Sequence, residues 1–196
     1  MKRKLAGLVA SGALLWSSAA MGQQALVVKE LAEKTVTALP AGPLVWRIEN
    51  FPTLEQAQAA AGSTGLAALA GGRVWLFTLG PAGGVSAGGT KVAEVGPVQR
   101  FASSQYLLRI NEATGPPGSF TPVHTHPGSE AFYVLAGETS QRTALGVSTV
   151  GAGQSLAGQD AGVPMQVSSS GSTDLHSLVM FVVDAGKPFS SPAAFP

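Results

Sequence analysis

Two of the three histidines in the chain, His124 and His126, stand two residues apart, and Glu130 follows them. Residues two apart in a β-strand point to the same face, so this spacing predicts two imidazoles side by side. Residues 127–129 (Pro-Gly-Ser) then break the strand, and a hairpin would bring the Glu130 carboxylate back toward both rings. Two imidazoles and one carboxylate suit a divalent transition metal (Fe, Mn, Ni, Zn or Cu) and leave positions open for a substrate.

The stretch around these residues resembles the first motif of the cupin superfamily, G-x5-H-x-H-x3-E-x6-G. Every fixed position is present, namely Gly118, His124, His126, Glu130 and Gly137. The resemblance is to single-domain, type 2-like cupins and covers about residues 104–184. It implies an all-β jelly-roll barrel, the double-stranded β-helix, with a metal at its centre held by the two histidines and the glutamate.

The second cupin motif, G-x5-P-x-G-x2-H, usually supplies a fourth ligand, but residues 161–167 (AGVPMQV) carry Met165 at the histidine position. In one interpretation the metal has three ligands and Met165 packs beside them. In another, the pocket holds an organic ligand and no metal. In a third, the Met165 thioether is itself a ligand, which would favour copper. We rank the three-ligand site first because buried imidazoles beside a carboxylate are costly without a partner.

His176 is a second candidate for the fourth ligand. It follows a predicted turn at residues 168–174 (SSSGSTD), which would place it about one strand diagonal, ~7–8 Å, from Met165. A one-residue slip in register would reverse its face, and a position at the rim or surface is the simpler expectation. Gln141 and Arg142 could support the site or bind a substrate carboxylate, although exposed polar positions on a strand are again simpler.

The first 22 residues have the pattern of a signal peptide. Lys2, Arg3 and Lys4 precede an apolar run over residues 5–16, and small residues follow at 17–20. The run is shorter than the roughly 20 residues that span a bilayer. We therefore expect cleavage before Met21 or Gln23, and a secreted or periplasmic protein that is not held in the membrane.

Composition favours one compact β-rich domain. The 196 residues include 25 Gly and 13 Pro, and 45% are hydrophobic, which is typical of short strands joined by turns. The absence of Cys excludes disulfides and thiolate ligands. Removing residues 1–22 lowers Lys plus Arg from 12 to 9 and leaves Asp plus Glu at 11, so the net charge changes from +1 to about −2. This balance predicts no nucleic-acid partner.

The remaining chain divides into three segments. Residues 23–100 are expected to form an N-terminal extension that adds strands to the same barrel, including 44–48 and 74–79, and one helix at 54–61. Residues 101–186 form the predicted cupin domain, with strands at 106–110 and 178–183. Residues 187–196, with three prolines, are predicted to be a surface tail.

The resemblance implies a secreted metalloprotein that acts on a small organic molecule, as dioxygenase-like or isomerase-like cupins do. The metal would act as a Lewis acid or bind substrate at its open positions. The sequence identifies no separate catalytic acid or base, so a non-catalytic protein that binds a small ligand or a metal is the alternative. Cupins often pair through their sheets, which makes a homodimer the candidate assembly.

Overall fold

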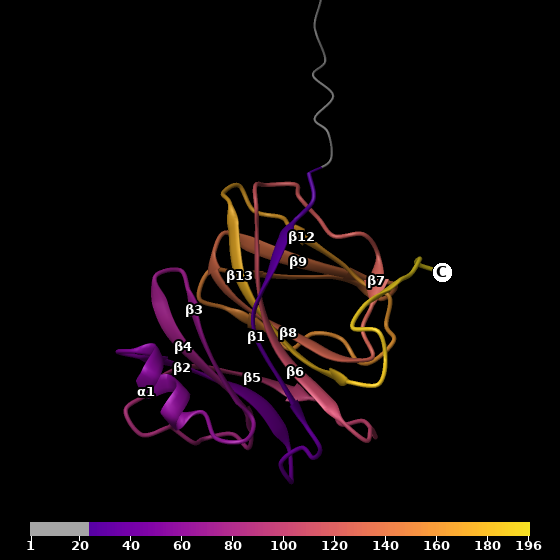
Figure 1. Ribbon diagram of the computed structural model, residues 1–196. Coiled ribbons are helices and arrows are strands. Elements are labelled where there is room, and N and C mark those ends of the chain that lie inside the picture. Colours follow the sequence, from indigo (N-terminus) through magenta and orange to yellow (C-terminus); the bar gives the residue numbers. More distant parts are fainter. Residues whose placement is uncertain (1–23) are drawn as a thin grey trace, which may run out of the picture.

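The structure is a computed structural model that describes residues 24–196, so the predicted signal peptide lies outside the described residues. The chain forms antiparallel sheets and one short helix, α1 (Leu54–Ala60), as the all-β prediction requires (Figure 1). The strands are β1 (Val27–Val36), β2 (Leu44–Phe51), β3 (Gly65–Ala70), β4 (Arg73–Gly80), β5 (Thr90–Val98), β6 (Tyr106–Gly115), β7 (His124–Thr125), β8 (Gly128–Ala136), β9 (Glu138–Thr143), β10 (Gly146–Gly151), β11 (Ser155–Leu156), β12 (Gln166–Ser169), β13 (Leu175–Asp184) and β14 (Ser191–Pro192).

Two sheets form the walls of a barrel. One has five strands in the order β1-β6-β13-β8-β11, and the other has three in the order β10-β9-β12. The short pair β14-β7 lies at one side, where the ribbon leads into the C-terminus (Figure 1). The central strand, β13, is buried on both faces, which explains its nearly continuous apolar sequence. Its alternate residues enter two cores, with Leu178, Met180 and Val182 on one face and Val179, Phe181 and Val183 on the other.

The segment 23–100 divides between two sheets. β1 pairs with β6 at the edge of the five-stranded sheet. In contrast, β2 to β5 form their own four-stranded sheet in the order β3-β4-β2-β5. This sheet packs on the outer face of the five-stranded one, where Trp46 and Phe77 join Ile110 and Met180 in one buried core. Burying each such large side chain contributes ~1.5–3 kcal/mol, so the added sheet supports the wall that carries the site.

The predicted helix is confirmed as α1, with the expected N-cap. The Thr53 side chain accepts a hydrogen bond from the backbone N–H of Gln56 at 3.2 Å. Gly62 follows the helix with φ of +58°, a conformation that glycine adopts without strain. No helix within residues 24–196 has the length and apolar character to cross a membrane.

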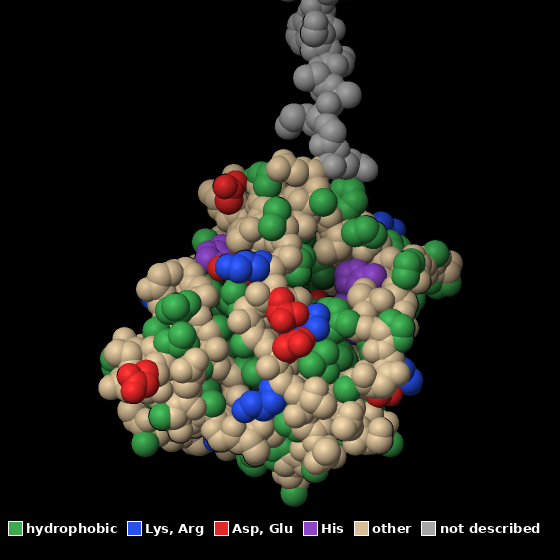
Figure 2. Space-filling view, viewed as in Figure 1, with side chains coloured by type: hydrophobic (Ala, Val, Ile, Leu, Met, Phe, Trp, Pro, Cys, Tyr) green, Lys and Arg blue, Asp and Glu red, His purple; other side chains and the backbone are tan. Residues whose placement is uncertain are grey.

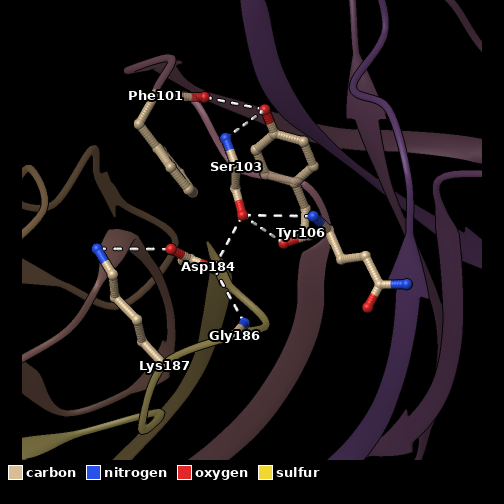
Figure 3. A network of polar contacts seen from close by, with 7 residues as sticks. Phe101, Ser103, Tyr106, Asp184, Gly186 and Lys187 are labelled. Carbon is tan, nitrogen blue, oxygen red and sulfur yellow. Dashed lines mark hydrogen bonds and ion pairs between the residues drawn. The ribbon is translucent and has the colours of Figure 1, made fainter.

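A polar network fixes the end of β13 (Figure 3). Asp184 Oδ1 accepts hydrogen bonds from the Ser103 hydroxyl at 2.8 Å and from the Gly186 N–H at 2.9 Å. These hydrogen bonds, together with Lys187 3.5 Å from Oδ2, lower the pKa of Asp184. The Tyr106 hydroxyl donates to the Phe101 carbonyl at 3.0 Å beside them. The network therefore sets the direction in which the chain leaves β13 toward residues 185–196, the C-terminal segment.

Candidate metal centre

The structure brings His124, His126 and Glu130 into one cluster. β7 carries His124, His126 lies in the turn that follows, and Glu130 lies near the start of β8. One ligand atom from each residue lies within 4.8 Å of the others, and the imidazole ring centroids are 4.9 Å apart. The predicted hairpin is wrong, because among the described residues β7 pairs with β14 whereas β8 pairs with β11 and β13. The chain instead turns between two sheets at residues 126–127, and this turn places the carboxylate beside both rings.

Backbone carbonyls fix the tautomer of both histidines. His126 Nδ1 lies 2.6 Å from the Phe189 carbonyl oxygen, and His124 Nδ1 lies 2.8 Å from the Pro122 carbonyl oxygen. A carbonyl oxygen only accepts, so each Nδ1 carries the proton and donates it. Each Nε2 is then left with a free lone pair, the form in which an imidazole binds a metal.

Gln141 is the buried partner of Glu130, which corrects the expectation of an exposed polar position. It is 1% exposed, and its Nε2 donates to Glu130 Oε2 at 3.1 Å and to the Met165 sulfur at 3.3 Å. Its Oε1 accepts from Gln159 Nε2 at 3.0 Å. The amide therefore orients the carboxylate, and its burial follows from the position of β9 across the barrel. Arg142, the next residue, is exposed as expected.

Met165 lies next to the cluster, as the second-motif alignment predicts. Its backbone exchanges two hydrogen bonds with His124, at 2.8 and 2.9 Å. The side chain is fully buried, its sulfur accepts from Gln141, and it is not among the residues that line the cavity. This placement favours the interpretation in which Met165 packs beside a three-ligand site.

Burial shifts the protonation of the two buried members of the cluster. Loss of hydration lowers the pKa of His126 to about 4, although the Phe189 carbonyl opposes the shift. Loss of hydration also raises the pKa of Glu130 to about 8, against the opposing hydrogen bond from Gln141. At neutral pH without a cation, His126 is therefore a neutral lone-pair donor and Glu130 holds a proton.

The chemistry of this donor set fits a divalent metal. Two imidazoles present free Nε2 atoms, and the buried carboxylate of Glu130 beside them has, within residues 24–196, a neutral amide and no cationic side chain as its hydrogen-bond partner. Nitrogen and carboxylate ligands in this ratio are typical of Fe, Mn, Ni, Zn or Cu sites with open positions. His124, His126 and Glu130 would hold the ion.

An apolar cavity of about 350 Å³ opens beside the cluster. His124, His126 and Glu130 all line it, so a ligand in the cavity would reach the metal. The remaining wall is mainly aliphatic and aromatic, and includes Leu26, Ala113, Phe132, Val167, Val179 and Phe181. Such walls exclude water and favour a small organic molecule.

The predicted surface tail, residues 187–196, lies at the surface and also contacts the His-His-Glu cluster. β14 pairs with β7 and places Pro192 opposite His124, and the edge position suits a residue that cannot donate a backbone hydrogen bond. The ring of Phe189 lies 4.9 Å from those of His126 and Phe181. Arg109 covers the other side of Phe189, with its Cζ 4.2 Å from the ring centroid. In Figure 2, histidine atoms reach the surface among hydrophobic side chains over this region.

His176 is not brought to the cluster. Its Nε2 lies 2.6 Å from Glu112 Oε1, and its ring lines a separate pocket with Trp75 and Tyr133. This pocket lies on the outer face of the five-stranded sheet, toward the β2–β5 sheet. Tyr133 thus lies on the face opposite Glu130, as strand alternation predicts, and Trp75 is buried in the core.

The two glycines of the motif adopt backbone conformations that are unfavourable for other residues. Gly118 has φ of +83° and Gly137 has φ of +71°. A Cβ on Gly137 would lie 2.5 Å from the Asp174 carbonyl oxygen. These positions therefore need glycine to bring β8 and the loop before β7 into place.

The two facing sheets, the motif glycines and the His-His-Glu cluster define a protein of cupin fold with a candidate metal centre. No protein-family model and no curated protein matches the sequence. Similar solved structures include a cupin-like protein from Thermotoga maritima, 13% identical with a TM-score of 0.40, covering 45% of this chain and 65% of that one. A protein with a double-stranded β-helix domain from Klebsiella pneumoniae is 20% identical with a TM-score of 0.38, covering 44% and 75%.

A DMSP lyase from Ruegeria pomeroyi is also 20% identical with a TM-score of 0.38, and covers 44% of this chain and 43% of that one. The chain thus spans less than two thirds of the length of the Thermotoga and Ruegeria proteins. The likeness concerns the fold alone.

Proposed function

We propose that the protein holds one divalent transition metal through His124, His126 and Glu130 and acts on a small, mainly apolar organic molecule bound beside it. The observation that carries this proposal is the convergence of three ligand atoms within 4.8 Å at the wall of an apolar cavity of about 350 Å³. A divalent metal there would polarise an oxygen atom of the bound molecule as a Lewis acid. Both the isomerase-like and the dioxygenase-like chemistry expected from the sequence need such an open site.

The residues of the chain prepare this site in three ways. The Phe189 and Pro122 carbonyls hold the imidazoles with Nε2 toward the cluster. Gln141 holds the carboxylate of Glu130. The apolar walls of the cavity exclude water, which strengthens every charge interaction inside.

Non-catalytic binding of a small ligand is the second candidate function. Among the described residues that line the cavity, the three proposed ligands are the only ones with an ionisable side chain. A site with no additional acid or base is suited to binding as well as to metal-assisted chemistry. Chromatography of a ligand recovered after incubation with metal-loaded protein separates the two functions, because only an enzyme returns an altered molecule.

The metal centre predicts one equivalent of transition metal in protein purified without chelator. Elemental analysis should give about one metal per chain, and His126→Ala should reduce this to background because one of three ligands is lost. Met165→Leu should keep the metal, since the thioether is not a ligand in this proposal. Met165→His should raise the affinity by supplying a fourth ligand, the third imidazole of the site.

His176→Ala is the matched control, because it removes an imidazole outside the cluster and should leave the metal content unchanged. A wild-type protein that binds no Fe, Mn, Ni, Zn or Cu and gains no thermal stability from any of them would contradict the proposal. Metal lost in Met165→Leu would support the copper–thioether site instead.

We also propose that residues 1–22 direct export, so that the protein works in the periplasm or outside the cell. The basic start, the short apolar run and the small residues before Met21 support this proposal.

A further inference from the structure

A buried amide without a hydrogen-bond partner stands in the wall of the cavity. Asn111, on β6, lines the cavity and is only 5% exposed, and its Oδ1 accepts no hydrogen bond. Among the cavity-lining side chains of residues 24–196, it alone has a buried polar atom of this kind. An unpaired buried amide lowers the stability of the folded protein. A ligand that enters the cavity and forms a hydrogen bond with Asn111 would explain why a polar residue stands at this position.

The strand register separates Asn111 from the metal cluster. Val179 on β13 lies opposite Asn111 on one side and Phe132 on the other, whereas Phe181 lies opposite Glu130. Asn111 is therefore two strands and two residues from Glu130, a Cα separation of ~12 Å from standard sheet spacings. Both side chains line the same cavity. A molecule that touches both ends must cross the apolar floor made by Val179 and Phe132.

The chemistry of the wall restricts what can reach Asn111. No Lys or Arg is among the residues that line the cavity. A carboxylate or phosphate at this end would therefore be buried without a counter-charge, which is strongly unfavourable. A neutral hydroxyl is suited to the position, because it can donate to an amide oxygen or accept from an amide nitrogen, whichever end of the Asn111 amide faces the cavity.

We propose that Asn111 binds a neutral hydroxyl group at the far end of a small, otherwise apolar substrate whose oxygen-donor end lies at the metal. This inference rests on the proposed function, and it names the substrate class of the same site. Asn111 is then a specificity-determining residue, since a buried polar group left unpaired rejects an analogue that lacks the matching hydroxyl.

Matched pairs of carboxylates test this inference. Protein loaded with Ni²⁺ is titrated calorimetrically with benzoate and 4-hydroxybenzoate, and with hexanoate and 6-hydroxyhexanoate. The hydroxylated member of at least one pair should bind about tenfold more tightly, the effect of one net hydrogen bond. Asn111→Leu, close to Asn in shape, should abolish or reverse this preference.

The other asparagine of the chain gives the control. Asn50 donates to the Val74 carbonyl at 3.0 Å and is not among the residues that line the cavity, so Asn50→Leu should keep the wild-type preference. No preference for the hydroxylated member of either pair in wild type, or an unchanged preference in Asn111→Leu, would overturn the proposal. The metal content of each sample is measured separately. Full metal without a hydroxyl preference overturns the role of Asn111 alone, whereas wild type without metal overturns the proposed function and this inference with it.

Discussion

Glu130 is the residue on which the energetics of the site depend. It is 4% exposed, and Gln141 is the residue that donates a hydrogen bond to its carboxylate. A neutral amide does not compensate the charge of a buried carboxylate, so the pKa rises to about 8. A divalent cation at the cluster would remove this penalty. The electrostatic cost of the metal-free state is therefore part of the driving force for metal binding.

The shifts at Glu130 and His126 predict how stability depends on pH in the metal-free protein. The folded-state pKa of Glu130 is raised from 4.5 to about 8, so its contribution is lost as pH rises toward 8. The pKa of His126 is lowered from 6.5 to about 4, so its contribution is lost as pH falls below 6.5. Between pH 6.5 and 8 the Glu130 effect exceeds the remaining, opposite effect of His126, and the free energy of unfolding should fall by ~1 kcal/mol.

Urea denaturation in the presence of a chelator at the two pH values measures this change. Glu130→Gln should show little dependence on pH over the same range, because it has no proton to lose. Saturating metal should also flatten the profile by pairing the carboxylate with a cation. Equal stability of the metal-free wild type at both pH values would contradict the burial of an uncompensated carboxylate.

At the scale of single residues, the sequence predicts what depends on local spacing. His124, His126 and Glu130 are close in the chain, and the turn between β7 and β8 brings them together. Gln141 reaches Glu130 only because β9 crosses the barrel, which no local pattern indicates. The face of His176 depends on a bulge between it and Ser177 in the pairing with β8, and a local pattern does not specify such a bulge.

Among the elements, the C-terminal segment contributes most to the site beyond the motif itself. The Phe189 carbonyl fixes the tautomer of His126, and the Phe189 ring packs between His126, Phe181 and Arg109. Arg109 in turn pairs with Glu30 and Glu33 on β1, at 3.3 and 2.5 Å. The segment thus connects the outer edge of the barrel to a metal ligand.

Removing this support should weaken metal binding although all three ligands remain. Loss of a residue that orients a metal ligand typically costs about 10- to 100-fold in affinity. Phe189→Ala keeps the backbone carbonyl but removes the ring that packs against His126 and holds that carbonyl in place, so we expect a loss near the lower end of this range, about tenfold, measured by competition with a chelator of known affinity. The unfolding free energy of the metal-free variants shows whether the effect is simply one on overall stability.

Phe195→Ala is the control within the same segment. Its ring lies under Arg142, with the guanidinium 4.7 Å from the centroid, and it is not among the described residues that line the cavity. The affinity of this variant should match that of wild type. Wild-type affinity in Phe189→Ala would show that the segment only lies over the site.

Elements of regular sequence pattern were predictable, whereas the C-terminal segment was not. The strands at 74–79 and 178–183 and the helix at 54–61 are confirmed, because apolar runs and a Thr cap are local signals. β14 has two residues, one of them proline, and forms only because β7 offers a free edge. The role of the C-terminal segment depends on tertiary contacts, which the amino-acid composition of the segment does not predict.

For the whole molecule, the sequence predicts the fold class but not how the β2–β5 sheet packs on the five-stranded sheet. The motif and the turn-rich composition predict an all-β cupin fold, which is confirmed. The extra sheet β2–β5 requires an outer face of the five-stranded sheet that is as apolar as the inner one. A single apolar strand such as β13 is compatible with several arrangements, so its two cores become distinct only in the folded molecule.

Export with cleavage of a signal peptide predicts the residue at which the mature chain begins. Intact mass of the exported protein should correspond to a chain that begins at Met21 or Gln23, with a net charge of about −2 instead of +1. Ala20→Arg, which places a large charged residue at the first of the two proposed cleavage positions, should shift processing to the second or block it. Exported protein that retains Lys2 to Lys4 would contradict the signal peptide.

The position of β13 in the sheet also determines when the site can form during synthesis. A ribosome releases β6 and β8 well before residues 175–184, yet β13 pairs with both and lies between them. The β2–β5 sheet can pair earlier, as soon as residue 98 has emerged, but the wall it packs against is then still incomplete. Phe189 emerges later still, 63 residues after the His126 it orients. A nascent chain therefore presents both imidazoles of the cluster before the Phe189 carbonyl that orients His126 has been made.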